Sequence, residues 1–240
     1  MPLSLQSRQV GGITVVTCNG RIVDGPEAAA LQQELSDLLP DRRYIVLDLA
    51  DVNYIDSSGL GLLVRLLMRI QGVHGHLKLS GVRANIGEVL RVTRLGTIFE
   101  SHGTNAEAVA AFYQTAAAPL APYRFDPVDI LCVDKSLDVL AFVRELLVQS
   151  GYGVMTTDNL PDALTLLQAT QPKLLVIGAE LRTAKATRTA ERFHELANAV
   201  LRVELPPDFS TVDAGRAADH VLAEVRAMIG DSGSAASYPR

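Results

Sequence analysis

The chain has 240 residues, a formal net charge of −5 and two cysteines. At roughly 100–200 residues per domain, this length predicts one large domain or two small ones. Residues 1–124 carry 11 basic and 11 acidic side chains, which leaves 11 basic and 16 acidic ones in residues 125–240. Neither half has the basic excess of a nucleic-acid binder, so we expect no direct contact with nucleic acid.

The cysteines and the apolar runs exclude further classes of protein. Cys18 and Cys132 both lie in apolar runs, and two cysteines cannot form a disulfide framework, so we expect both to be reduced and buried. The first residues lack the charged and apolar regions of a signal peptide. No apolar run approaches the roughly 18 residues of a membrane span. We therefore expect a cytoplasmic protein without a membrane segment.

The first half predicts a β-hairpin followed by alternating helices and strands. Glycines 11 and 12 favour the turn of the hairpin, and Pro26 and Pro40 bound the first helix. In chain order, we expect strands at 3–10, 12–18, 44–49, 76–80 and 98–99, and helices at 28–39, 58–71, 85–93 and 105–116. This order predicts an α/β fold with a mixed sheet and helices.

Small residues and prolines at 116–122 indicate a domain boundary. We expect a first domain at 1–116, a linker at 117–127, a second domain at 128–230 and a disordered tail at 231–240. In the second domain, we expect strands at 128–133, 152–156, 173–177 and 200–205, and helices at 136–150, 161–169, 183–199 and 213–229. Strict alternation of strand and helix predicts a parallel sheet with helices on its faces.

The most informative stretch of the first half is Asp56-Ser57-Ser58-Gly59-Leu60-Gly61, which follows a buried strand and opens a helix. A serine at this place lies near unpaired backbone N–H groups and the positive end of the helix dipole, where an added phosphate is stabilised. The two glycines lower helix propensity and leave room for the backbone of a partner. A serine before a helix is also a common N-cap, and both interpretations stay open.

The same stretch carries a resemblance to a known family. Together with the strand Ile45–Leu49 before it and with Gly20-Arg21-Ile22-Val23-Asp24, it makes residues 1 to about 116 similar to the STAS domain of bacterial anti-sigma factor antagonists. By this resemblance, Ser57 is phosphorylated by a partner anti-sigma factor, an ATP-dependent serine kinase. The unphosphorylated antagonist binds that kinase and frees the sigma factor, and phosphorylation switches the antagonist off.

The resemblance also implies which residues contact the partner. Asp24 aligns, after a one-residue insertion before Pro26, with a family aspartate that helps to hold the kinase. Asp24 is equally explained as a turn residue in Val-Asp-Gly. The other residues implied in partner binding are Asp56, Ser58, Gly59, Leu60 and Gly61.

Residues 128–229 resemble a response-regulator receiver, a flavodoxin-like parallel α/β domain, but they depart from it at its reactive positions. Asp134 is present, whereas Lys135 stands where a second acid is expected and Gly178 where the phosphate-accepting aspartate is expected. One carboxylate beside a lysine is a poor Mg²⁺ site. One strand–helix unit is also missing. We therefore expect a pseudo-receiver that serves docking, dimerisation or binding of an unknown ligand, and a similar fold without receiver ancestry stays the alternative.

Together these observations predict a bacterial signal-transduction protein that regulates transcription, without enzymatic activity, cofactor or metal. Its partner would be an anti-sigma factor serine kinase, its switch would be Ser57, and a homodimer through the second domain is one arrangement to test. The alternative is a STAS scaffold in a larger signalling assembly, in which Ser57 is no more than a helix cap.

Overall fold

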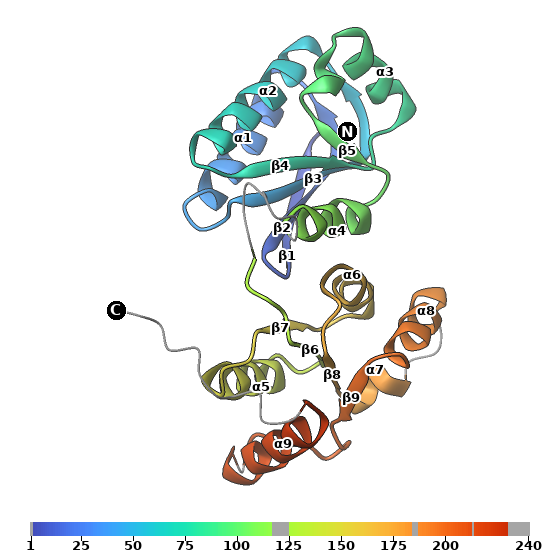
Figure 1. Cartoon of the computed structure of the whole chain (residues 1–240). Helices are drawn as coiled ribbons and strands as arrows, with labels where there is room; N and C mark the ends of the chain where they lie inside the picture. Colours follow the sequence, from blue (N-terminus) through green and yellow to red (C-terminus); the bar gives the residue numbers. More distant parts are fainter. Residues whose placement is uncertain (1, 117–124, 184–186, 213, 230–240) are drawn as a thin grey trace. The chain divides into compact units, whose positions relative to one another are not determined.

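The computed structural model describes residues 2–116, 125–183, 187–212 and 214–229. The chain divides into two compact units, Met1–Ala118 and Pro119–Arg240, and each has a sheet of its own (Figure 1). Most of the expected linker and the expected disordered tail lie outside the described residues. None of the described helices is long and apolar enough to cross a membrane.

The first unit is a five-stranded mixed sheet with the strand order β1-β2-β3-β4-β5. Its strands are β1 (Ser4–Val10), β2 (Ile13–Ile22), β3 (Tyr44–Ile55), β4 (His76–Ser80) and β5 (Glu100–His102). Its helices are α1 (Pro26–Leu38), α2 (Ser57–Gly72), α3 (Ala84–Val92), the 3₁₀ turn η1 (Leu95–Thr97) and α4 (Asn105–Ala116). Only β1 and β2 pair antiparallel, as the expected hairpin requires.

Helices cover both faces of this sheet. Helices α1 and α2 lie on one face and α4 lies on the other (Figure 1). The central strand β3 is accordingly buried without interruption from Ile45 to Leu49. On the first face, Leu63 and Ile70 of α2 and Leu31 of α1 pack into the core. This core fixes the position of α2, whose first residue is Ser57.

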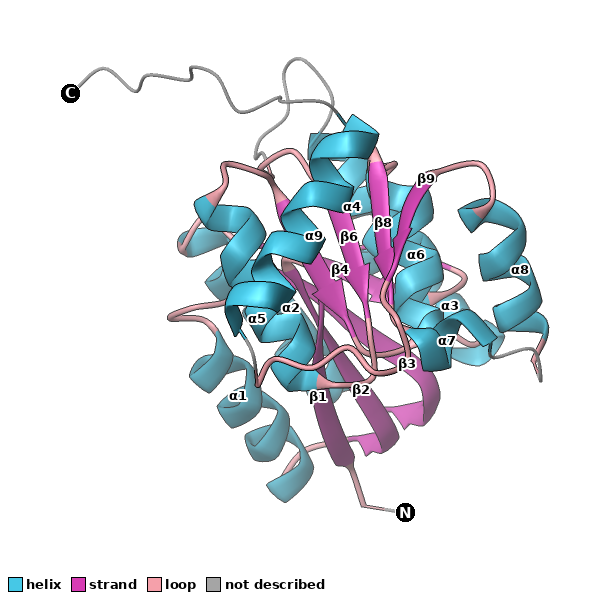
Figure 2. Cartoon of the chain, turned by 90° about the horizontal axis from the view of Figure 1, so that it is seen from below, coloured by secondary structure: helices cyan, strands magenta, loops and turns pink. Residues whose placement is uncertain are grey.

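The second unit is a four-stranded parallel sheet with the order β7-β6-β8-β9. Its strands β6, β8 and β9 are labelled in Figure 2. Its strands are β6 (Ile130–Val133), β7 (Val154–Thr157), β8 (Leu174–Ile177) and β9 (Leu201–Glu204). Its helices are α5 (Leu137–Gln149), α6 (Leu160–Thr170), α7 (Ala179–Thr183), α8 (Arg188–Ala197) and α9 (Ala214–Ile229). Helices α5 and α9 lie on one face and α6 and α8 on the other (Figure 1).

Several elements differ from the sequence-based expectations. Strands β2 and β3 continue past the expected ends at 18 and 49, to Ile22 and Ile55. The strand expected at 98–99 is wrong: Phe99 is buried in the core, but the chain there leaves η1, and β5 begins at Glu100. The helix expected at 183–199 is confirmed as α8, but it is shorter, from Arg188 to Ala197, and a separate short helix, α7, ends at Thr183. Thr187 starts α8 as a new helix, since its hydroxyl accepts a hydrogen bond from the backbone N–H of Ala190 at 3.2 Å.

Candidate functional site

The start of α2 exposes Ser57 and uses its neighbour as the helix cap. The Asp56 carboxylate accepts a hydrogen bond through Oδ1 from the backbone N–H of Gly59 at 2.7 Å. Ser57 is therefore the first helical residue and not the cap, which corrects the interpretation of Ser57 as a capping residue. Ser57 and Ser58 are both exposed, and the Ser57 hydroxyl makes no hydrogen bond to the part of the chain that the structure describes.

The same carboxylate also holds the loop after β2. Oδ2 of Asp56 accepts a hydrogen bond from the backbone N–H of Asp24 at 3.3 Å, and the backbone N–H of Asp56 donates to the Ile22 carbonyl at 3.4 Å. These bonds bring together Asp24 and the start of α2, which lie 32 residues apart in the chain. Asp24 itself is exposed. The two positions that the resemblance links to the kinase therefore share one surface.

The two glycines of the motif have different surroundings. A Cβ on Gly59 would lie 2.2 Å from the Ile22 carbonyl oxygen, so a side chain there would force α2 away from β2. At Gly61 the nearest atom is Nη1 of the flexible Arg65, at 3.3 Å. Gly59 thus serves packing inside the unit, and the space left by its missing side chain is filled by Ile22. Leu60 is also buried, at 8% exposure. Of the two glycines, only Gly61 is partly exposed.

An added phosphate at Ser57 would meet two opposing influences. The unpaired N–H groups of the first turn and the helix dipole favour negative charge at this end. The Asp56 carboxylate, one residue away, disfavours it by like-charge repulsion. A phosphate on Ser57 would add negative charge to the exposed start of α2.

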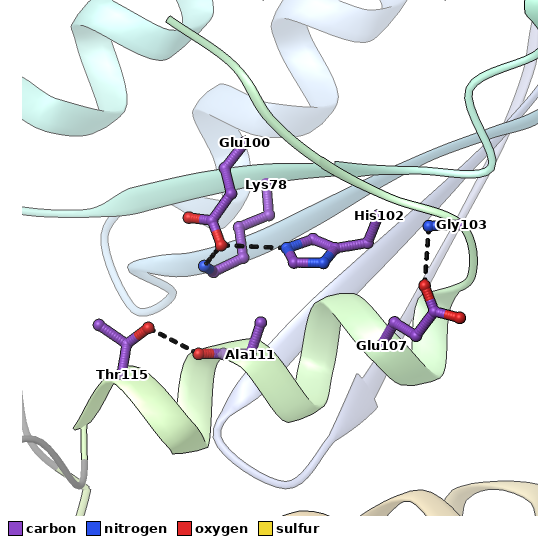
Figure 3. A network of polar contacts seen from close by, with 7 residues as sticks. All are labelled: Lys78, Glu100, His102, Gly103, Glu107, Ala111 and Thr115. Atoms are coloured by element: carbon purple, nitrogen blue, oxygen red, sulfur yellow. Dashed lines mark hydrogen bonds and ion pairs between the residues drawn. The ribbon is translucent and has the colours of Figure 1, made fainter. Parts of the chain in front are cut away.

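A polar network around the buried Lys78, on the α4 face of the sheet, was not foreseen from the sequence. Lys78 of β4 is only 3% exposed, and its ammonium group pairs with Glu100 and lies 4.8 Å from the ring centre of Phe112 on α4. Glu100 also accepts from His102, at 3.1 Å from Nε2 (Figure 3). Burial alone would raise the pKa of Glu100, but Lys78 and His102 outweigh it and lower that pKa below 4.5.

A second buried group of polar side chains anchors the start of α4. Asn105 donates through Nδ2 to Asp48 Oδ2 at 2.6 Å and accepts from the Ser80 hydroxyl at 2.5 Å. Burial, and then the nearby Asp48 charge, raise the pKa of the Cys18 thiol to about 12. Cys18 is therefore an unreactive core residue at neutral pH. These contacts stabilise the fold and do not reach Ser57.

In the second unit, the three residues of the predicted degenerate site meet at the ends of β6 and β8. Asp134 follows β6 and accepts a hydrogen bond through Oδ1 from the backbone N–H of Ser136 at 2.7 Å. A Cβ on Gly178 would lie 1.8 Å from Oδ2 of Asp134, so the carboxylate occupies the place of the missing side chain. Lys135 is exposed beside a pocket of about 210 Å³ that Asp134 also lines.

No group of three or more His, Cys, Asp or Glu side chains is placed to hold a metal ion in the described ranges. The pocket beside Asp134 is lined by two carboxylates, Asp134 and Glu180, and by Lys135. The positive charge of Lys135 disfavours a Mg²⁺ ion at this place.

The first unit matches a known domain family. Residues 4–108 match the STAS domain family. The N-terminal half of the chain contains a STAS domain. Over 115 residues the chain is 28% identical to the putative anti-sigma factor antagonist BtrV of Bordetella bronchiseptica, which covers 48% of this chain and 97% of that relative. The resemblance read from the Asp56–Gly61 motif is thereby confirmed for the STAS domain.

Solved structures give similar matches. A putative anti-sigma factor antagonist from Thermotoga maritima is 26% identical, with a TM-score of 0.42, over 45% of this chain and 92% of that one. An anti-sigma factor antagonist from Mycobacterium paratuberculosis is 23% identical, with a TM-score of 0.42, over the same shares. Each of these matches, like the STAS match, covers less than half of the chain.

Proposed function

We propose that this protein is an anti-sigma factor antagonist that binds an anti-sigma factor serine kinase and is switched off by phosphorylation of Ser57. The observation that carries the proposal is the exposed Ser57 at the first position of α2, directly after the capping Asp56, within a STAS domain. The 28% identity to a relative named as a putative anti-sigma factor antagonist supports the same role. The protein itself acts by binding and catalyses no reaction.

The switch follows from charge and size. A phosphate adds about −1.5 to −2 charges and three strong acceptor oxygens. Beside Asp56 it creates a dense negative patch on a surface that, unmodified, presents a neutral hydroxyl. A partner that docks its backbone on Gly61 and Ser58 loses that contact to repulsion and bulk. Since about 1.4 kcal/mol corresponds to tenfold in affinity, loss of this contact weakens binding by tens- to thousand-fold.

Asp24 is the second partner-binding residue in this proposal. Its backbone N–H is held by Asp56, while its own carboxylate points from an exposed turn. A basic side chain of the kinase would pair with it. Phosphorylation of Ser57 changes the surroundings of this turn through the shared Asp56 carboxylate.

For the second unit, we infer a receiver-like domain that lacks phosphoryl chemistry and serves docking or regulation. Its order β7-β6-β8-β9 corresponds to the first four strands of the 2-1-3-4-5 order of flavodoxin-like sheets. Asp134 ends the first strand as in a receiver, and Gly178 replaces the acceptor at the end of the third. Lys135 beside Asp134 further disfavours a cation.

The experiment that tests the proposal is phosphate mapping. The full-length protein is incubated with ATP and the serine kinase encoded nearest to its gene, and the modified residue is identified by mass spectrometry. Phosphate on Ser57, absent in Ser57→Ala and retained in the matched Ser58→Ala variant, is the expected result. Intact binding without phosphate on Ser57 would favour the STAS scaffold instead.

A further inference from the structure

Strand β9 forms one edge of the sheet in the second unit, and no strand among the described residues pairs with its outer side. An open edge presents unpaired backbone N–H and C=O groups, which pair readily with another strand. From the pattern of its backbone and charges, we infer that β9 binds β9 of a second copy of this chain as an antiparallel pair. The pair would join two four-stranded sheets into one. This inference does not depend on the function of Ser57.

The register with β8 identifies the groups that face outward. The backbone N–H of Leu205 donates to the Ile177 carbonyl of β8 at 2.9 Å. Because successive residues of a strand direct their hydrogen-bonding groups to opposite sides, Leu201, Val203 and Leu205 bond toward β8. The N–H and C=O groups of Arg202 and Glu204 therefore point away from the sheet.

Three registers place these outward residues of the two copies opposite each other. Only one of the three sets opposite charges against each other. In an antiparallel pair, the residues that exchange hydrogen bonds stand opposite each other. Arg202 can thus oppose Arg202 of the second copy, Glu204 can oppose Glu204, or each Arg202 can oppose Glu204. The first two registers set like charges against each other. The third gives two pairs of opposite charges and four backbone hydrogen bonds, with Val203 on the two-fold axis.

The side chains at this edge are partly exposed, and they already have partners within the unit; Arg202 donates a hydrogen bond to Asn198 Oδ1 at 2.8 Å. Arg202 and Glu204 lie on the same face of β9, with Nε and Oε1 3.1 Å apart, and their side chains are 43% and 36% exposed. Arg182 of α7 also pairs with Glu204, which holds the carboxylate at the edge. Leu201 is 51% exposed, and in the third register it stands opposite Leu205 of the second copy. The edge is thus complementary to itself, which favours a second copy over an unrelated strand.

Charge reversal tests this register on the full-length chain. Sedimentation velocity from about 1 to about 100 µM measures the monomer–dimer equilibrium of the wild type. We expect Arg202→Glu and Glu204→Arg each to weaken the dimer about ten-fold or more, because each replaces two opposite-charge pairs by two like-charge pairs. The double variant R202E/E204R should dimerise again. An equimolar mixture of the two single variants should form heterodimers, because every cross-strand pair is then of opposite charge.

A matched control separates this effect from a general change of charge. Arg192→Glu makes the same charge change on α8 rather than on β9, and should leave the dimer unchanged. In the wild type, Arg192 pairs with Glu195 at 2.9 Å. Circular dichroism checks that each variant is folded. A wild type that stays monomeric throughout, a dimer insensitive to both single variants, or variants that are not rescued by mixing would each overturn the inference.

Discussion

The carboxylate of Asp56 accepts a hydrogen bond from the backbone N–H of Asp24 at 3.3 Å while it caps the helix that begins at Ser57. One side chain therefore holds two segments, the turn after β2 and the first turn of α2. Through it, the proposed kinase-binding residue and the proposed phosphorylation site share one surface.

Asp56→Ala should lower the free energy of unfolding by about 1 kcal/mol, because it removes a helix N-cap. Asp56→Asn keeps an oxygen acceptor for the Gly59 N–H and should cost less. Urea denaturation of both variants measures the difference. Equal stability of Asp56→Ala and the wild type would show that the cap contributes nothing.

Gly59→Ala should destabilise the protein by about 1–3 kcal/mol, since the new Cβ would collide with the Ile22 carbonyl oxygen. Gly61→Ala is the matched control in the same helical turn. It has only the mobile Arg65 nearby and should be neutral or gain up to about 1 kcal/mol from helix propensity. Thermal unfolding compares the two. A similar effect of both substitutions would contradict the assigned packing role of Gly59.

Local sequence patterns predicted most elements because the apolar spacing and the prolines agree with the final packing. The identity of the α2 cap could not be predicted, since Asp56, Ser57 and Ser58 are all good N-caps. Asp56 is held in place by contacts with Ile22 and Asp24, which are far away in sequence. The role of Gly59 likewise depends on Ile22, which is far away in sequence.

The buried pairs were missed for a related reason. The alternating segment 76–80 predicts a strand with one polar face, yet both faces are covered, and Lys78 is buried against Phe112 and Glu100. No local sequence pattern predicts that Lys78 pairs with Glu100, which lies 22 residues further along the chain. The strand expected at 98–99 is wrong because Phe99 packs into the core although it lies just before β5.

Stability should fall on acidification, from His76 first and then from Glu100. Burial, and then the charge of Lys78, lower the pKa of His76 below 6.5, although Glu100 opposes this. The unfolded chain therefore takes up this proton at a higher pH than the folded one, so stability is lost as pH falls below 6.5 through the folded pKa. Because the pKa of Glu100 is also lowered, stability should fall further as the pH drops below 4.5.

The thermal midpoint from about pH 8 to about pH 4 measures this loss. His76→Asn should flatten the first part of the decline and leave the second part. A midpoint that rises as the pH falls through 6.5 would contradict the sign derived from His76.

Gly178 and Asp134 should be energetically coupled. Gly178→Ala places a Cβ against Oδ2 of Asp134 and should destabilise the protein by about 1–3 kcal/mol. In an Asp134→Ala background the same substitution should cost clearly less, because the obstructing carboxylate is gone. A double-mutant cycle by urea denaturation measures the coupling, and strict additivity would contradict the contact.

The same contact predicts that Gly178→Asp does not create a phosphoryl acceptor. The new carboxylate would compete with Asp134 for one space, beside Lys135. Incubation with acetyl phosphate and Mg²⁺ should therefore leave this variant unmodified by intact-mass measurement. Stoichiometric phosphorylation at position 178 would show that the site keeps its chemistry.

The most direct test of the central claim is the affinity of the cognate kinase for the two forms of this protein. Isothermal titration calorimetry compares the unphosphorylated protein with protein phosphorylated at Ser57, and Ser57→Ala serves as the unmodifiable control. Phosphorylation should raise Kd by at least about ten-fold, and Ser57→Ala should bind like the unphosphorylated form. Equal affinity for both forms would contradict a switch at Ser57.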